Sequence, residues 1–218
     1  MIRKIEELMY RHFTTIPFHN LDLIYGQPLF YAIPGGTCSD KTLAFLRDAR
    51  ELGADAHLHS AFIGGKEIHR LVRISVNEHT FFADVGNGWP ALKLFSADKG
   101  ISFDCFGMTY RTEIAGKWIR VFHKKQGKES LQIEINSIPK PEAKIRDQIN
   151  ARYTSGIEYP FSKSLRFSLI VGNEFLFLRG NRLERYTTYN YSVKELNKKD
   201  IATTIHSCFG FDINGYFS

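Results

Sequence analysis

The chain has 218 residues, of which 43% are hydrophobic and 24% are charged, and its net charge is +6. This composition excludes wholesale disorder, and the length suits one compact unit made of a few sub-domains. The first residues, MIRKIEE, carry charges where a secretory signal needs an apolar run. No stretch reaches the roughly 18–20 apolar residues of a membrane span. We therefore expect a cytoplasmic protein with no membrane partner.

The positions of the cysteines, histidines and basic residues argue against three further classes of protein: disulfide-rich, metal-binding and nucleic-acid-binding. Cys38, Cys105 and Cys208 are scattered, which suits neither a disulfide framework nor a zinc site, so we expect reduced thiols and no metal. His57 and His59 would share a strand face, but no third ligand with suitable spacing accompanies them. The Lys and Arg residues are dispersed and form no recognition module, so no nucleic-acid partner is expected.

The first third of the chain predicts two helices. Apolar residues at three- and four-residue steps place a helix before Pro17: Ile2, Ile5, Leu8, Met9 and Phe13. An irregular stretch follows over 16–28. A second helix begins at about Cys38, because Thr37 and Ser39 can cap it and Asp40 suits its first turn. Gly53 is a natural terminator of this helix.

The pattern then changes to period two. Strands are predicted at 56–63, 71–76, 81–85, 117–123 and 130–136, so 56–137 is β-rich and suits a small barrel. The remainder predicts strands at 165–171 and 174–179 and a helix over 192–208. Pro139 and Pro141 mark a boundary between the β-rich stretch and this remainder.

Cys38 is the candidate nucleophile. It lies at a predicted helix start, where the positive end of the helix dipole lowers the pKa of a thiol. Gly35 and Gly36 before it allow a tight turn that exposes the sulfur, and N–H groups of a helix start can stabilise an oxyanion. Taken alone, this position also suits a buried structural cysteine.

His69 and Asp84 are the candidate base and its partner. With a turn at 77–78, Leu71 pairs with Asp84, and His69 lies one diagonal away on the same face. A carboxylate beside an imidazole orients the ring and stabilises its charged form. An imidazolium beside Cys38 would activate the thiol.

Several stretches, in this order, resemble the arylamine N-acetyltransferase family. Positions 16–21 read IPFHNL, similar to the family's IPFEN-L, and positions 35–40 read GGTCSD, similar to its RGG-x-C-x-E nucleophile motif. His69 falls at the family's histidine. Positions 83–88 read ADVGNG against V-D-V-G-F-G, and positions 209–211 read FGF against F-G-I. The resemblance runs through most of the chain.

The resemblance implies an α+β fold with a cysteine-protease-like Cys-His-Asp core. It implies three parts, which we place at 1–55 (a helical N-terminal region that carries the nucleophile), 56–138 (a central β-barrel that carries the histidine and the aspartate) and 139–218 (a C-terminal α/β lid). It implies a ping-pong acyl transfer from acetyl-CoA through Cys38 to an arylamine-type acceptor. His69 would move the protons, and Asp84 would orient His69. Cofactor contact is implied for three loop residues: Gly86, Asn87 and Gly88. Three aromatic residues are candidates for an acceptor pocket, with core packing as the alternative for each: Phe18, Phe81 and Phe82.

The chain departs from the family's pattern around the nucleophile. The departures are Pro34 for arginine, Thr37 for an aromatic, Asp40 for glutamate, Thr42 for asparagine, His19 for glutamate and Asn87 for an aromatic. They affect the residues that support the site more than Cys38, His69 and Asp84 themselves.

Two alternatives stay open. The order Cys, His, Asp also suits amide synthases and transglutaminase-like enzymes, which would load Cys38 from another acyl donor. A non-catalytic binding protein that retains the fold is the second alternative. The sequence leaves the physiological acceptor and the oligomeric state open.

Overall fold

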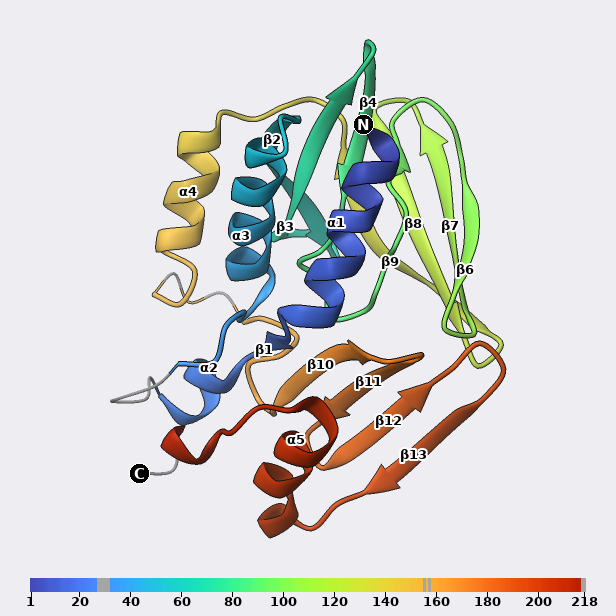
Figure 1. The fold of residues 1–218 in the computed structure, drawn as a ribbon. Coiled ribbons are helices and arrows are strands. Elements are labelled where there is room, and N and C mark those ends of the chain that lie inside the picture. The colour runs from blue at the N-terminus through green and yellow to red at the C-terminus, as the bar shows by residue number, and fades with distance from the viewer. Residues whose placement is uncertain (27–31, 155, 157, 217–218) are drawn as a thin grey trace.

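The computed structural model describes residues 1–26, 32–154, 156 and 158–216. Its helices are α1 (Ile2–Thr15), α2 (Leu21–Tyr25), α3 (Cys38–Glu51), α4 (Glu142–Asn150) and α5 (Ile201–Phe209), with 3-10 turns η1 (Lys198–Asp200) and η2 (Asn214–Tyr216). Together with two antiparallel sheets they form a mixed α+β structure, which confirms the predicted class (Figure 1). No helix in the described part of the chain has the length and apolarity needed to cross a membrane.

The larger sheet is the predicted barrel, present as a curled half-barrel with order β5-β4-β3-β2-β9-β8-β7-β6. Its strands are β2 (Asp55–Ile63), β3 (Lys66–Val76), β4 (His79–Ala83), β5 (Phe95–Ser96), β6 (Ser102–Cys105), β7 (Met108–Ala115), β8 (Trp118–Lys125) and β9 (Lys128–Asn136). The concave side holds an apolar cluster that includes Phe82, Tyr110 and Val121. The middle of β3 is continuously buried because α3 covers one face and this cluster covers the other.

The smaller sheet joins the two ends of the chain. Its order is β1-β10-β11-β12-β13, where β1 is Phe18–His19, β10 is Arg166–Val171, β11 is Glu174–Arg179, β12 is Arg182–Tyr186 and β13 is Tyr191–Glu195. Phe18 pairs with Ser168, so the segment after α1 is an edge strand of a sheet formed more than a hundred residues later. In Figure 1 this sheet lies below the half-barrel, with α5 packed on it.

Helix α3 packs on β2 and β3 of the larger sheet, α4 packs on β2, and α1 packs on α3 and on β10 of the smaller sheet (Figure 1). The apolar stripe of α1 that was predicted from the sequence is the buried face, and its Ile5 and Phe13 belong to the same apolar cluster as Phe45 of α3. The same cluster continues to Phe175 and Phe177 of β11. One apolar interior therefore connects the helices with both sheets.

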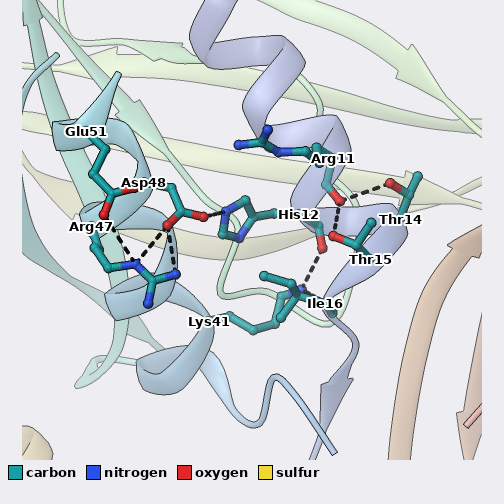
Figure 2. A network of polar contacts seen from close by, with 9 residues as sticks. All are labelled: Arg11, His12, Thr14, Thr15, Ile16, Lys41, Arg47, Asp48 and Glu51. Carbon is teal, nitrogen blue, oxygen red and sulfur yellow. Dashed lines mark hydrogen bonds and ion pairs between the residues drawn. The ribbon is translucent and has the colours of Figure 1, made fainter. Parts of the chain in front are cut away.

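A buried polar contact joins α1 to α3. His12 Nε2 lies 2.8 Å from Asp48 Oδ2, and Lys41 Nζ donates to the carbonyl oxygens of His12 and Ile16 at the carboxyl end of α1 (Figure 2). The last carbonyls of a helix have no partner within it, and a cation there also stabilises the helix dipole. Lys41 therefore caps α1 from the neighbouring helix.

One predicted element is wrong in its boundaries. The single helix expected over 192–208 is a strand, β13, followed by η1 and then α5. β13 pairs with β12 from Tyr186↔Tyr191 to Arg182↔Glu195, and this pairing overrides the weak helical pattern of a short segment. The structure also adds α4, β6, β7 and β12, which the sequence did not predict. Positions 27 and 28 of the irregular stretch lie outside the described residues.

Candidate active site

Cys38 is the first residue of α3, at the position the sequence predicted. The chain reaches it through Gly35 and Gly36, whose φ angles are +103° and +128°. A Cβ at Gly35 would stand 2.1 Å from the carbonyl oxygen of Pro17, and His19 donates its N–H to Gly36 O at 2.9 Å. Glycine is required here because the nucleophile loop packs backbone to backbone against β1.

Asp40 caps the N-terminus of α3 and also forms an ion pair with Arg152, more than a hundred residues later in the chain. Its Oδ2 accepts the N–H of Thr37 at 3.0 Å, as a capping residue does. Its Oδ1 accepts from Arg152 Nη2 at 2.9 Å, in the turn after α4. Pro34 stands where the resembled family has its arginine. Arg152 therefore supplies a guanidinium to this carboxylate from a position that the sequence did not single out.

His69 and Asp84 are brought together as the predicted hairpin requires. The register places Val72 opposite Ala83, so His69 in β3 reaches Asp84 just beyond the end of β4. His69 Nε2 lies 2.8 Å from Asp84 Oδ1, and both side chains are almost fully buried. Nδ1 is then the ring nitrogen that remains for the sulfur of Cys38. Asn87 donates to the second carboxylate oxygen, Oδ2 of Asp84, at 3.3 Å.

The charges of these groups are coupled. Burial opposes charge on His69, but the charge and hydrogen bond of Asp84, together with Cys38, raise the pKa of His69 to about 10. Burial also acts against a Cys38 thiolate, yet the hydrogen bond and charge of His69 and the nearby Arg70 hold the pKa of Cys38 below its ordinary value of 9.0. Both shifts favour the charged forms, a thiolate beside an imidazolium, over the neutral thiol and imidazole.

Gly86 allows the nucleophile and the histidine strand to approach each other. A Cβ on it would lie 2.6 Å from Thr42 Oγ1, 2.8 Å from Cys38 O and 2.9 Å from Arg70 O. Thr42 Oγ1 in turn donates to Arg70 O at 2.9 Å, so the residue at the family's asparagine position ties α3 to β3. The loop after Asp84 therefore packs directly against the backbone that carries Cys38.

Cys38 and His69 open into a cavity of about 290 Å³. Of the predicted binding residues, this cavity is lined by Phe18, Gly86, Asn87 and Gly88. The structure places the other two elsewhere: Phe82 is in the half-barrel core, and Phe81 packs against the helix cluster. We therefore do not assign Phe81 and Phe82 to the acceptor pocket.

The cavity has a second wall that the sequence did not identify. It consists of side chains from the loop after Asp84, the segment before β10 and the smaller sheet: Trp89, Tyr159, Pro160, Phe161, Arg166, Phe177 and Arg179. Period-two patterns located β10 and β11 but gave no sign that their ends face Cys38. Among the residues that the structure describes, no group of three or more potential metal ligands is found.

Comparison with known proteins identifies the relatives of this chain. A family model described as N-acetyltransferase matches residues 1–216. No curated protein matches the chain.

Three solved structures illustrate the likeness in fold. Arylamine N-acetyltransferase from Nocardia farcinica has a TM-score of 0.83 at 18% identity, covering 100% of this chain and 86% of that one. The Salmonella typhimurium enzyme has a TM-score of 0.80 at 18% identity, covering 97% and 85%. The Mycobacterium marinum enzyme in complex with CoA has a TM-score of 0.81 at 16% identity, covering 99% and 89%.

Proposed function

The chain belongs to the N-acetyltransferase family, and from this premise we propose that it transfers an acetyl group from acetyl-CoA through a thioester on Cys38 to an arylamine-type acceptor. Membership of the family makes the protein an acetyltransferase. The proposal adds the donor, the covalent intermediate, the class of acceptor and the roles of the residues. One observation carries it: the buried contact of His69 with Asp84, beside a thiol whose pKa is lowered, at the end of an aromatic cavity.

In the first half-reaction the Cys38 thiolate attacks the thioester carbonyl of acetyl-CoA. A bond forms between Cys38 Sγ and the acetyl carbon, and the bond from that carbon to the sulfur of CoA breaks. The imidazolium of His69 gives its proton to the departing CoA thiolate, so CoA leaves as a thiol and His69 becomes neutral. Asp84 stays ionised and keeps the ring oriented.

In the second half-reaction the acceptor nitrogen attacks the acetyl-Cys38 carbonyl. Neutral His69 takes the proton that the nitrogen loses, the C–S bond breaks, and Cys38 returns to the thiolate. The amide product leaves with the acetyl group, and the starting pair of thiolate and imidazolium is restored. His69 is the proton donor in the first half-reaction and the proton acceptor in the second. A raised pKa of His69 suits the resting enzyme, because the ring must carry its proton before acetyl-CoA reacts.

Acetyl-CoA is proposed as the donor on two grounds. The Mycobacterium marinum enzyme of similar fold has been solved in complex with CoA. In this chain Gly86, Asn87 and Gly88 line the cavity beside Cys38, where a thioester must be placed. A Cβ added to Gly88 would stand 3.2 Å from Phe177 Cζ and 3.4 Å from Phe18 Cδ1, so a side chain at this position would crowd the wall of the cavity.

Intact mass after incubation with acetyl-CoA alone tests the proposal. We expect one acetyl adduct on the wild type and none on Cys38→Ala. Cys208→Ala is the matched control, because Cys208 is a half-exposed thiol away from the cavity and its removal should leave the adduct unchanged. An adduct that persists in Cys38→Ala contradicts the assignment of the nucleophile.

Alkylation of Cys38 by iodoacetamide distinguishes the two explanations that remain if acetyl-CoA gives no adduct. If acetyl-CoA gives no adduct but iodoacetamide still modifies Cys38 rapidly near neutral pH, the thiol is active and takes a different acyl donor, as an amide synthase would. If Cys38 is inert to both reagents, a non-catalytic binding role replaces the proposal.

A further inference from the structure

The loop that leads into Cys38 rests against a carboxylate with two different sets of partners. Asp40 Oδ2 accepts the N–H and the hydroxyl of Thr37, the residue directly before Cys38, at 3.0 and 2.9 Å. A Cβ on Gly36 would stand 2.7 Å from the same oxygen, so the carboxylate lies against the backbone of this loop. The other oxygen, Oδ1, accepts from Arg152 Nη2 at 2.9 Å. Arg152 therefore reaches the nucleophile loop through Asp40.

The residue after Arg152 makes a second contact with the same loop. The hydroxyl oxygens of Tyr153 and Thr37 share a hydrogen bond at 3.1 Å. The Arg152 guanidinium lies over the Tyr153 ring, 4.8 Å from its centroid. Arg152 Nη1 also donates to Ile149 O at 3.0 Å, which ties the guanidinium to the last turn of α4. Two consecutive residues after α4 thus hold the N-terminus of α3.

The exposure of the ion pair argues against stability as its main role. The Arg152 side chain is 23% exposed and the Asp40 side chain is 34% exposed, so water screens the attraction between them. Ion pairs that water can screen stabilise a fold only weakly. The location of this pair is more informative, because it lies at the first turn of the helix that begins with Cys38.

The charge of Asp40 by itself is unfavourable for a thiolate. Asp40 lies two residues after Cys38 in the first turn of α3, and a carboxylate near a thiol raises the pKa of that thiol. A negative cap also offsets the positive end of the helix dipole, which favours the thiolate. Burial opposes the guanidinium charge, but contacts with Tyr153 and the charges of Asp40 and Cys38 raise the pKa of Arg152. A cation at Arg152 and a thiolate at Cys38 therefore stabilise each other.

We propose that Arg152 is a positioning residue for the nucleophile: it neutralises Asp40, so that the capping carboxylate holds the start of α3 without opposing a thiolate at Cys38. Arg152 acts through Asp40 and touches no reacting atom. The inference rests on the proposed role of Cys38 as the nucleophile. It goes beyond the proposed function by adding a second cation, besides His69, that sets the charge of the thiol.

The pH profile of Cys38 alkylation tests the proposal. In Arg152→Gln the carboxylate of Asp40 keeps its charge without a partner, so the midpoint for modification by iodoacetamide should rise by roughly 0.5–1 pH unit. Arg152→Lys keeps the charge but not the forked geometry, so its midpoint should stay close to that of the wild type. A purely structural role would lower the stability of both variants in urea and leave both midpoints unchanged, and that result overturns the proposal.

Arg146→Gln is the matched control. Arg146 is exposed and pairs with Glu142 within α4 at 3.7 Å. None of the polar contacts found among the described residues joins Arg146 to the nucleophile loop. Its loss removes one arginine from the same helix region, so the midpoint should match that of the wild type. An equal rise in Arg146→Gln and Arg152→Gln would reduce the effect to net charge and overturn the proposal.

Asp40→Asn is a second variant that does not depend on the folding of Arg152→Gln. Asparagine keeps a side-chain oxygen for the N–H of Thr37 but carries no charge, so the midpoint should fall below that of the wild type. Adding Arg152→Gln to Asp40→Asn should shift the midpoint less than Arg152→Gln does alone, because the carboxylate that Arg152 neutralises is gone. Equal shifts in the two backgrounds, or no fall in Asp40→Asn, contradict an action through Asp40.

Alkylation needs no acetyl-CoA, so this test is separate from that of the proposed function. If acetyl-CoA fails to load Cys38 but the midpoint rises in Arg152→Gln, the proposed function fails and the positioning role stands. If the acetyl adduct forms and the midpoint is the same in the wild type and Arg152→Gln, the positioning role fails and the proposed function stands.

Discussion

The pKa values of Cys38 and His69 move in opposite directions because each group stabilises the charge of the other. Asp84 makes this possible, since its carboxylate lies 2.8 Å from the ring and both side chains are almost fully buried. Without that partner, burial would favour the neutral forms of both the thiol and the imidazole. The reactivity of the thiol is therefore a property of the three residues together.

The pH dependence of alkylation tests this coupling. We expect the rate of Cys38 modification by iodoacetamide to rise with a midpoint below pH 9, since the pKa of Cys38 is lowered from 9.0. In His69→Gln the stabilising cation is lost and burial acts alone, so the midpoint should move above that of the wild type. Mass spectrometry of the modified peptide gives the rate at each pH.

Cys105 provides an internal control for this measurement. Burial raises the pKa of Cys105 to about 12, so it should not react near neutral pH in either protein. Cys208→Ala in both backgrounds removes the half-exposed thiol. An unchanged midpoint in His69→Gln would show that His69 does not stabilise the thiolate.

Three of the departures around the nucleophile, Asp40, Thr42 and Asn87, make polar contacts in this structure. Arg152 contacts Asp40 where the resembled family has an arginine at the position of Pro34, and Thr42 holds the carbonyl of Arg70 in place of an asparagine. Asn87 donates to Asp84, a contact that an aromatic side chain could not make. These three residues therefore hold parts of the chain that carry or adjoin Cys38, His69 and Asp84.

At the scale of elements, the placement of Cys38 depends on how α3 is joined to α1. Lys41 is three residues after Cys38 and is 1% exposed, and it donates to carbonyl oxygens at the end of α1. Burial lowers its pKa to about 7. Burial of Lys41 therefore disfavours its charged form, although its Nζ supplies hydrogen bonds to the last carbonyl oxygens of α1.

Lys41→Met tests this cap through the pH dependence of stability. The pKa of Lys41 is about 7 in the folded protein against an ordinary value of 10.5, so between these values the unfolded chain binds more protons. Folding stability from this group then rises with pH. The free energy of unfolding of the wild type minus that of the variant should grow above pH 7, by at most about 1.4 kcal/mol per pH unit.

Urea unfolding at pH 7, 8 and 9 measures this difference. Lys144→Met on α4 is the matched control, because Lys144 is exposed and its substitution should give a difference that is flat with pH. Taking differences also cancels the contributions of other groups such as His69. A flat difference for Lys41→Met would mean that Lys41 stays charged in the folded protein.

The elements that the sequence predicted well are those with one strong pattern. The apolar stripe of α1 and the cap of α3 are local signals, and both helices begin where expected. β13 has no such signal, since all five of its residues are exposed. Its strand conformation comes from the hydrogen bonds of the neighbouring β12, which lie outside any local window.

At the scale of the whole molecule, the cavity exists because segments far apart in the chain are held together. Asn20, which is 2% exposed, follows β1 and contacts the segment that leads into β10. Its Nδ2 donates to Phe161 O at 2.6 Å and Ser164 O at 2.9 Å, and its Oδ1 accepts the N–H of Arg166 at 2.6 Å. Asn20 therefore positions two residues of the cavity wall, Phe161 and Arg166.

Asn20→Ala should loosen this junction. Three part-buried backbone groups would lose a hydrogen bond, so we expect the free energy of unfolding to fall by roughly 2–4 kcal/mol in urea titrations. The acceptor KM should also rise, because Phe161 and Arg166 are no longer held.

Asn181→Ala is the matched control for this prediction. Asn181 is exposed and makes a single 3.3 Å contact with Leu196 O, so its loss should change the free energy of unfolding by less than about 1 kcal/mol. A loss of stability in Asn20→Ala no larger than in Asn181→Ala would show that the junction is held by other contacts.

The sequence by itself determined the mixed class, the helix start at Cys38 and the hairpin that brings His69 to Asp84. These depend on caps, periodicity and a short turn, which act over a few residues. The boundaries at 55 and 138 stay predictions. Only the tertiary structure decided that Phe18 lines the cavity while Phe81 and Phe82 do not, and that Arg152, Arg166 and Arg179 reach the site. Their roles arise from pairing and packing between distant segments, and local sequence patterns carry no information about such contacts.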